Sequence, residues 1–410
     1  MLMELQLLKK SQLTRTIIVD FRSGPTHSGR GLRASNHSTF PLVLKNLLSQ
    51  CGLKERQDGK STMETSPSRR QFLNTTKSLG LGLGSAPLWT GIDLSSAEEE
   101  EEKEKPSTMN TMNTGLVSDL RYLEHTQGGT HPESPARLKA IHEKIKEAGL
   151  DKKLVPIKPT VDPLPFIKMI HSEEHLAVAG KQAHDDAICR LSVSGALSAV
   201  DAVCGGKLRN AFCAIRPPGH HAANNGEYGF CFYNNVAVAA RYAQEKHKLK
   251  KILIVDWDYH HGDGTEWAFY DDPSVLLFST HALYAFPGTG AAEKTGKGKG
   301  EGFNINVPLP RGANDEAVLG AFKEKLLPAA EKFQPDLVLI SAGFDSRHDD
   351  LLGDFNFTDK GFAQLTKLVM EIAGKHCGSR VVSLLEGGYN VQGLALGVEA
   401  HLEALLGKDR

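Results

Sequence analysis

The pattern of apolar and polar positions changes near residue 116. Beyond this point, short apolar runs without polar alternation occur at 211–215, 251–258, 274–280, 303–309, 336–341 and 380–385. Such runs are typical of strands that are covered on both faces. Helical patterns lie at 134–149, 234–246, 314–332, 358–375 and 391–406. This alternation predicts an α/β domain over 116–410, with three layers and a mainly parallel central sheet.

The first of these helical patterns carries start and stop signals. Ser134 and Pro135 open it, and Gly149 closes it. Serine is a preferred N-cap residue, and proline suits the first helical position because the missing N–H is not needed there. We therefore expect Ser134 to cap this helix.

Residues 1–115 show no sustained apolar period, and we expect a disordered N-terminal region. Segment 68–91 begins Ser-Arg-Arg-Gln-Phe-Leu and continues weakly apolar, which resembles a twin-arginine export signal that would start near Met63. The alternatives are an organellar transit sequence and a chance Arg-Arg pair. The Glu-rich segment 97–114 indicates an acidic, solvated linker. We predict an exported or periplasmic protein if the signal is genuine, and a cytoplasmic one otherwise.

Composition excludes several classes of protein. The chain has 48 Lys and Arg against 49 Asp and Glu, so direct nucleic-acid binding is not indicated. We find no uncharged apolar run long enough for a transmembrane segment. Six cysteines without a CxxC pair argue against a zinc finger, a redox dithiol or a disulfide framework. The number of histidines, 17, is the unusual feature of the composition. The composition leaves the oligomeric state open.

Polar residues follow the apolar runs, at the strand ends where ligands bind in such folds. The run at 251–258 leads into Asp256, Asp258, His260 and Asp263. The first three would face the same way if the strand continued, because side chains alternate along a strand. Asp258 and His260 suit a divalent metal, and Asp345, after the run at 336–341, is a candidate third ligand. Each of these motifs alone could be a helix cap. Together, however, ionised side chains packed this closely repel one another unless a cation neutralises them.

Two other strand ends carry candidate catalytic groups. The run at 211–215 leads through a Pro-Pro-Gly turn into His220 and His221. Histidine has a suitable pKa for a base, and Asp256 and Asp263 are spare acids that could orient the pair. Tyr389 follows a Gly-Gly turn, where its hydroxyl could donate to a carbonyl oxygen. From sequence patterns alone, an ordinary half-buried tyrosine is the simpler interpretation of Tyr389.

Six motifs together carry a family resemblance. They are HPESPARL at 131–138, RPPGHHA at 216–222, DWDYHHGDG at 256–264, FPGTG at 286–290, SAGFD at 341–345 and EGGY at 386–389. In this order they resemble the histone deacetylase family, which has the arginase/deacetylase fold. RPPGHH and SAGFD are similar to its class II branch and bacterial relatives. The resemblance covers residues 116–410.

The resemblance implies a zinc-dependent deacetylase with a role for each matching residue. One zinc per subunit would be bound by Asp258, His260 and Asp345. His221 would be the general base, oriented by Asp263, and His220, held by Asp256, its electrostatic partner, while Tyr389 would polarise the acyl carbonyl. The implied substrate-binding residues are Phe230, Phe286, Leu352, Gly229 and Gly388. A potassium ion is also implied, at Asp256, Asp258, His260, Ser279 and Thr280.

The substrate stays open between an acetylated lysine peptide and a small acetylated amine such as a polyamine. Export would favour the small amine. The alternative function is a catalytically weak module that binds acyl-lysine, although no implied catalytic residue is missing. A ureohydrolase would need a second ligand cluster, which the chain lacks. Segment 163–186 is expected at the substrate rim, where its acids Glu173, Glu174, Asp185 and Asp186 would meet a cationic substrate or, more simply, be solvated.

Overall fold

The computed structural model describes residues 113–226 and 228–408, so the predicted export signal lies outside the described part. Its centre is an eight-stranded sheet with the order β2-β1-β3-β8-β7-β4-β5-β6. Every pairing in it is parallel, which confirms the predicted fold class. The strands are β1 Thr114–Val117, β2 Val155–Ile157, β3 Asn210–Cys213, β4 Ile252–Asp256, β5 Val275–Ala282, β6 Asn304–Leu309, β7 Leu337–Ala342 and β8 Val381–Leu385.

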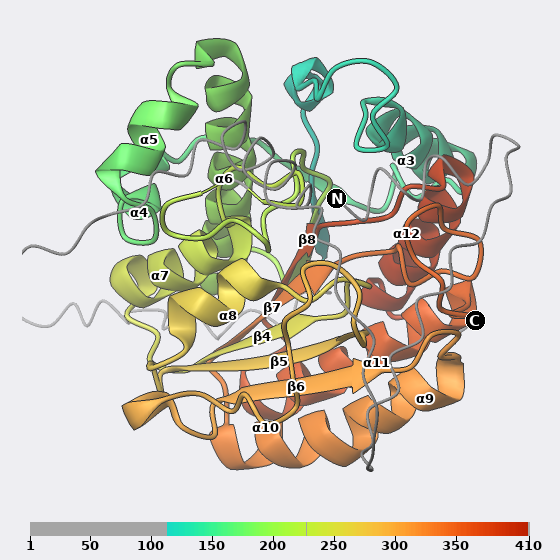
Figure 1. Cartoon of the computed structure of the whole chain (residues 1–410). Helices are drawn as coiled ribbons and strands as arrows, with labels where there is room; N and C mark the ends of the chain where they lie inside the picture. Colours follow the sequence, from blue (N-terminus) through green and yellow to red (C-terminus); the bar gives the residue numbers. More distant parts are fainter. Residues whose placement is uncertain (1–112, 227, 409–410) are drawn as a thin grey trace, which may run out of the picture. The chain divides into compact units, whose positions relative to one another are not determined.

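Helices cover both faces of this sheet (Figure 1). On one face lie α4 Leu164–Ile167, α5 Glu173–Ala179, α6 Ala183–Cys204, α7 Asn235–His247 and α8 Asp263–Phe269. On the other lie α3 Ala136–Glu147, α9 Asp315–Ala321, α10 Leu327–Phe333, α11 Asp359–His376 and α12 Val391–Leu405. Short 3-10 helices form at Leu120–Glu124 and Gly298–Gly300. Three layers result, as predicted.

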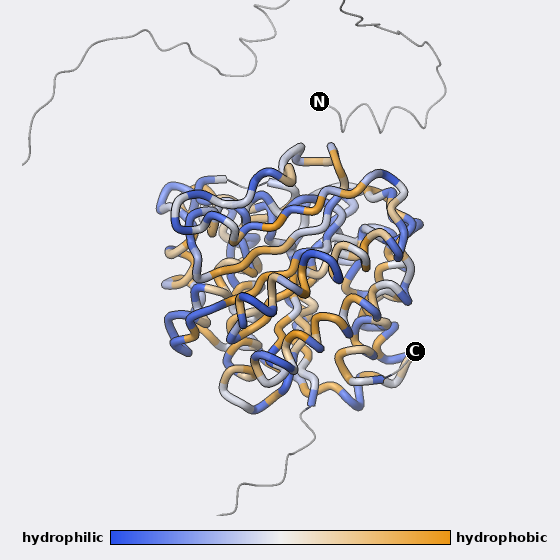
Figure 2. The backbone as a smooth tube through the Cα atoms, turned by 90° about the horizontal axis from the view of Figure 1, so that it is seen from below, coloured by the Kyte–Doolittle hydropathy of each residue, from blue (hydrophilic) through white to orange (hydrophobic). Residues whose placement is uncertain are grey.

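Burial explains the absence of alternation in the central strands. Every residue of β3, β4, β5, β7 and β8 is buried, because helices exclude water from both sides. Apolar backbone segments gather in the middle of the described part, and hydrophilic ones surround them (Figure 2). Burying each Val, Leu or Ile side chain stabilises the fold by about 1.5–3 kcal/mol.

Side-chain caps set the starts of several helices. Asn234, Asn314, Thr358 and Asn390 each accept a hydrogen bond from a backbone N–H three residues later. The prediction that the Ser134 side chain caps α3 is wrong. Pro135 is the N-cap residue, and α3 has no side-chain cap. Ser134 contributes only its backbone oxygen, which accepts a hydrogen bond from Arg137 N. The predicted helix at 314–332 is divided by a π-helical turn at Phe322–Leu326.

The sequence patterns missed β1 and β2 among the strands and α4, α5, α6 and α8 among the helices. β1 begins at Thr114, so the predicted linker ends before this residue and the domain begins before residue 116. β2 is three residues long and contains Pro156, and such short strands carry little periodic signal. α6 is apolar on most sides because the sheet, α5 and α7 cover it.

The expectation that no segment has the composition of a membrane span is also corrected. Among the described residues, α6 is long and apolar enough to cross a membrane by length and composition alone. Two thirds of its apolar window, 67%, is buried inside the protein. That burial is the ordinary property of a core helix.

Candidate active site

The candidate site lies where the carboxyl ends of four neighbouring strands meet. β3, β8, β7 and β4 are adjacent in the sheet and run parallel, so the segments that follow them share one edge. These segments carry His220 and His221 after β3, Tyr389 after β8, Asp345 after β7, and Asp258 and His260 after β4. The fold therefore brings together residues that are up to 169 positions apart, from His220 to Tyr389.

Asp258, His260 and Asp345 form one cluster whose ligand atoms all lie within 4.8 Å of one another. His260 Nδ1 is 3.2 Å from Asp258 Oδ1 and 3.0 Å from Asp345 Oδ2. Backbone N–H groups hold the carboxylates: Gly387 donates to Asp258 and Tyr259 donates to Asp345. The strand itself ends at Asp256. The strand does not continue to His260, which was the condition for alignment by alternation, and the loop after β4 brings Asp258 and His260 to Asp345.

The charges of this cluster suit a divalent cation. Burial and the Asp258 carboxylate raise the pKa of Asp345 to about 7. Burial opposes ionisation of His260, but Asp258 and Asp345 raise its pKa to about 10. Two buried carboxylates repel each other, and a cation relieves that repulsion. Two carboxylates and one imidazole are also ligands that zinc accepts, with positions left over for water and substrate.

Glycines leave the space that the cluster needs. A Cβ atom on Gly387 would lie 2.3 Å from Asp345 Oδ2, and one on Gly343 would lie 2.1 Å from Asp258 Oδ2. Any side chain at these positions would displace the carboxylates. The donor set and its surroundings therefore fit a zinc ion.

His220 and His221 lie beside the cluster, each bonded to a carboxylate. His221 Nδ1 is 2.7 Å from Asp263 Oδ1, and His220 Nδ1 is 3.0 Å from Asp256 Oδ2. His220 Nε2 lies 3.8 Å from Asp258 Oδ1. The two ring centroids are 4.0 Å apart. Asp263 and Asp256 each bond to the Nδ1 atom of one imidazole, so the Nε2 atoms stay available to reacting groups.

The two imidazoles differ in charge. Burial and the neighbouring His220 lower the pKa of His221 to about 3, so its ring is neutral. Burial also disfavours the charged form of His220, but Asp258, Asp256 and Glu386 together raise its pKa well above the ordinary value. One neutral and one cationic imidazole side by side can accept one proton and supply another.

Two of the implied substrate-binding residues, Phe230 and Phe286, pack against catalytic candidates. The Phe230 ring centroid is 5.8 Å from that of Tyr389, and the Phe286 ring is 5.1 Å from that of His221. Tyr389 is 5% exposed, whereas Phe286 and Leu352 are 43% and 37% exposed. The partly exposed Phe286 ring thus contacts a buried catalytic candidate, as expected of a residue at the entrance of a substrate site.

Gly229 and Gly388 have backbone conformations that favour glycine, with φ of +53° and +119°. A Cβ atom on Gly229 would lie 2.2 Å from the His221 ring. Gly388 turns the chain between β8 and Tyr389, and its carbonyl oxygen accepts a 2.7 Å hydrogen bond from Arg137.

A group of buried charges beneath the site had no role predicted from the sequence. Glu386 is fully buried and accepts hydrogen bonds from the backbone N–H of Gly219, at 2.7 Å, and of His220, at 3.1 Å. Glu133 pairs with Arg137 and Arg216. All four residues are charged positions inside the motifs quoted above, and this is the signal by which the sequence could have indicated them.

Asp350 was also missed. Its Oδ2 accepts from the backbone N–H of Tyr389, at 2.6 Å, and of Asn390. Its Oδ1 accepts from the N–H of Leu352 and Gly353. A single carboxylate thus joins the loop after β7 to the loop that carries Tyr389.

The acids of the predicted rim have different environments. Glu173 is exposed and pairs with Lys168. Asp186 is buried, and it accepts from the Tyr233 hydroxyl at 2.5 Å and pairs with Arg190. The expectation that Asp186 is solvated or faces substrate is therefore wrong: it joins α6 to the core. Asp185 lies 3.2 Å from His125 Nδ1.

The implied potassium residues are neighbours in the sheet. Ser279 of β5 is in register with Asp256 of β4. Ser279 and Thr280 are buried, and Ser279 Oγ bonds to His281 Nδ1 at 2.9 Å. Ser279 therefore lies directly beside Asp256 in the sheet.

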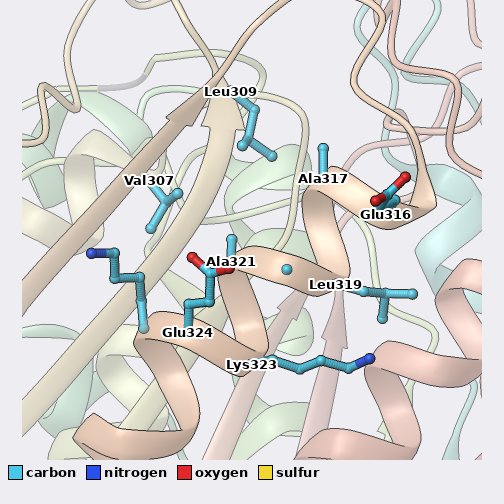
Figure 3. A pocket seen from close by; sticks show the side chains of 10 residues that line it. Val307, Leu309, Glu316, Ala317, Leu319, Ala321, Lys323 and Glu324 are labelled. Carbon is cyan, nitrogen blue, oxygen red and sulfur yellow. The ribbon is translucent and has the colours of Figure 1, made fainter.

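A separate cavity of about 560 Å³ lies at the sheet edge, between β6 and the segment that runs from α9 into the π-helical turn (Figure 3). Val307 and Leu309 line one side, and Ala317, Ala321 and Glu324 line the other. None of the residues singled out for chemistry lines it.

Comparisons with known proteins agree with this geometry. The model of the histone deacetylase domain matches residues 131–405. The chain is 38% identical over 312 residues to "Histone deacetylase 10, chloroplastic" of Oryza sativa subsp. japonica, covering 68% of this chain and 70% of that protein. It is 37% identical over 298 residues to "Probable deacetylase" of Archaeoglobus fulgidus. This match covers 69% of this chain and 83% of that protein.

A solved structure supports the same fold. The crystal structure of the HDA15 HD domain matches with a TM-score of 0.69 and 34% identity, over 73% of this chain and 89% of that chain. The predicted arginase/deacetylase fold is thereby confirmed.

Proposed function

Because the chain belongs to the histone deacetylase family, we propose that it is a zinc-dependent amidohydrolase that removes acyl groups from lysine side chains or from other primary amines. The observation that carries the proposal is the cluster of Asp258, His260 and Asp345, with ligand atoms within 4.8 Å. This cluster lies beside a neutral His221, and we infer that Phe230, Phe286 and Leu352 line an apolar channel that leads to it.

Asp258, His260 and Asp345 would hold the zinc. When bound, zinc supplies a Lewis acid for the acyl carbonyl and lowers the pKa of a coordinated water. His221 Nε2 takes the proton of the attacking water, because the ring is neutral and Asp263 holds Nδ1. Cationic His220 stabilises the developing charge and supplies a proton to the departing amine. The Tyr389 hydroxyl donates a hydrogen bond to the carbonyl oxygen as that oxygen becomes negative.

The channel explains why a long aliphatic amine suits the site. Phe230, Phe286 and Leu352 offer apolar surface to methylene groups, which gain about 0.8 kcal/mol for each one buried. A lysine side chain and a polyamine arm both provide such a chain. Either can bring an acyl group to the buried histidines.

We also propose that potassium binds behind the zinc site, at Asp256, Asp258, His260, Ser279 and Thr280. The support is the register of Ser279 with Asp256 and the burial of both residues. A monovalent cation here would offset part of the buried negative charge.

Acetate release by the purified full chain tests the proposed function. We expect zinc-dependent turnover of acetyl-lysine peptides or acetylpolyamines, and its loss on chelation. Tyr389→Phe should lower kcat by about 10²–10³-fold, the usual effect of removing one donor to such an oxygen. Tyr242→Phe is a matched control, because the Tyr242 hydroxyl bonds to Asp201 on α6, away from the site.

Two results would contradict the proposal. One is a folded, zinc-loaded protein that releases no acetate from either substrate class. The other is a Tyr389→Phe variant as active as the parent chain. Binding of acyl-lysine peptides without turnover would instead favour the acyl-lysine-binding module.

A further inference from the structure

The three loops that form the channel wall each carry a second apolar side chain that is exposed outside it. Tyr228 precedes Phe230, Tyr284 precedes Phe286, and Leu351 precedes Leu352. Their exposed fractions are 53%, 91% and 65%. We call Tyr228, Tyr284 and Leu351 the outer ring. Exposed apolar side chains beside a site suit a ligand that buries apolar surface against them.

Tyr284 is the unusual member of the outer ring. Its φ is +62°, in the left-handed region that favours glycine. The hydrogen bond from Ala285 N to Ala282 O closes the turn around it at 3.3 Å. Among the residues that the structure describes, neither its hydroxyl nor its ring has a partner. The fold thus gains nothing from a tyrosine here, where glycine would adopt the turn at lower cost.

The outer ring is continuous with the channel. Phe286, two residues after Tyr284, packs 5.1 Å from His221. Leu283 N donates to Leu309 O at 2.8 Å, and Gly312 N donates to Asp354 O at 3.1 Å. The loop of Tyr284 and the loop of Leu351 are therefore joined through the segment that follows β6.

The carboxylates that flank Leu351 in the chain are already paired. Asp350 accepts hydrogen bonds from four backbone N–H groups. Asp354 bonds to the Tyr259 hydroxyl at 2.6 Å and pairs with Arg311. Asp349 pairs with Arg347. A cationic neighbour of the acyl group would find no unpaired anion among these three, whereas an apolar neighbour would bury surface against Tyr284 and Leu351.

We propose that the outer ring is a docking surface for the polypeptide on either side of an acyl-lysine, and that it selects apolar flanking side chains. Tyr284 is its main specificity-determining residue. This inference rests on the proposed function and extends it to the substrate class: an acyl-lysine within an apolar stretch of protein is preferred to a free acylated polyamine.

Two acetyl-lysine peptides test the inference, one with leucine on both sides of the acetyl-lysine and one with lysine on both sides. The full chain should show a lower KM for the leucine peptide. Tyr284→Gly suits the turn, so the protein should fold, and it should raise KM for the leucine peptide about tenfold, as expected of a main contact residue. Its kcat, and its activity on free acetyl-lysine, should stay unchanged.

Two variants separate binding from structure. Tyr284→Phe keeps the ring and should restore the low KM. Trp267→Ala removes an aromatic side chain from α8 that is 52% exposed and lies outside the outer ring. It should change neither KM nor kcat for the leucine peptide. Equal KM values for both peptides, or an equal loss for Tyr284→Gly on every substrate, would overturn the inference.

Peptide binding keeps this test independent of turnover. Fluorescence anisotropy of the labelled peptides gives a Kd even if the chain releases no acetate. Tighter binding of the leucine peptide, lost in Tyr284→Gly, would support the inference while the proposed function failed. Equal affinity for both peptides would overturn it.

Discussion

Among single residues, Glu386 has the most unusual environment. It is fully buried and bonds to two successive backbone N–H groups, of Gly219 and His220. Its other oxygen has no hydrogen-bond partner among the described residues. Burial raises the pKa of Glu386 to about 7, although cationic His220 acts in the opposite direction. We infer that Glu386 is a positioning residue, which orients the histidine pair and helps to keep His220 charged.

Replacing Glu386 with Gln should therefore change both rate and pH dependence. Loss of a negative charge lowers the pKa of His220, so the alkaline limb of the kcat profile should move to lower pH. We expect kcat to fall about 10- to 100-fold, the usual effect of losing such a support, with little change in KM. A pH-rate profile on acetyl-lysine measures both effects.

Glu266→Gln is the matched control, since Glu266 bonds to Asn304 and Asn306 on β6. It should leave the alkaline limb in place. A Glu386→Gln profile that superimposes on that of the parent chain would show that this carboxylate serves only stability.

Between elements, His401 joins two helices to the sheet. Its Nδ1 lies 2.7 Å from Thr366 Oγ1 on α11, and its Nε2 lies 2.9 Å from Ser383 Oγ on β8. Burial lowers the pKa of His401 to about 3, so the ring is neutral in the folded protein. His171 and His281 are similar, with pKa values lowered by burial to about 4 and about 3. The fold thus uses neutral histidines as hydrogen-bonding links.

These links predict acid sensitivity. In the unfolded chain histidine has a pKa of about 6.5, so only the unfolded state takes up the proton as the pH falls below that value. The contribution of His401 to stability is complete above about pH 6.5 and is lost toward pH 3, at about 1.4 kcal/mol per pH unit. Urea unfolding at about pH 7.5 and pH 5.5 measures the change.

His401→Gln removes the titrating group. It should be less stable than the parent chain at about pH 7.5 and lose about 1.4 kcal/mol less on going to pH 5.5. Thr366→Val removes a bonding partner but keeps the imidazole, so its stability should fall with the parental pH dependence. If His401→Gln keeps the parental pH dependence, His401 is not the source of the acid sensitivity.

For the whole molecule, the described part contains every residue assigned to the site and begins one residue before β1. β1 lies between β2 and β3 in the sheet. The Thr114 hydroxyl donates to Leu405 O at 3.2 Å, so the first residues of the domain bind its last helix. The export or transit function of the preceding region stays a prediction, which N-terminal sequencing of the mature protein would test.

Truncation tests where the domain begins. A chain of residues 113–410 should keep the acetate-release activity of the full chain, because all proposed catalytic groups follow residue 113. A chain of residues 116–410 should have a Tm several degrees lower, since it loses part of β1 and each lost hydrogen bond contributes about 1 kcal/mol. Thermal unfolding and acetate release of both proteins give the comparison. Loss of activity on removing residues 1–112 would show that this region contributes to the site.

Patterns along the chain were enough to predict the central strands, most helices and the positions of the chemical groups. Apolar runs are local signals, and motifs such as the one at 256–264 carry their meaning within a few residues. Local signals were insufficient for β1, β2 and α6, whose stability comes from neighbours distant in the chain.

Which groups meet, and how they are charged, depends on the folded arrangement of the chain. The pKa values of His220 and His221 separate because burial and neighbouring charges act differently on two adjacent rings. Glu386 acquires its function from contacts with a loop 166 positions away at His220. The exposure of Tyr284 depends on which surfaces the fold leaves uncovered. Burial and electrostatic interaction are properties of three-dimensional neighbourhoods, so a pattern along the chain cannot specify them.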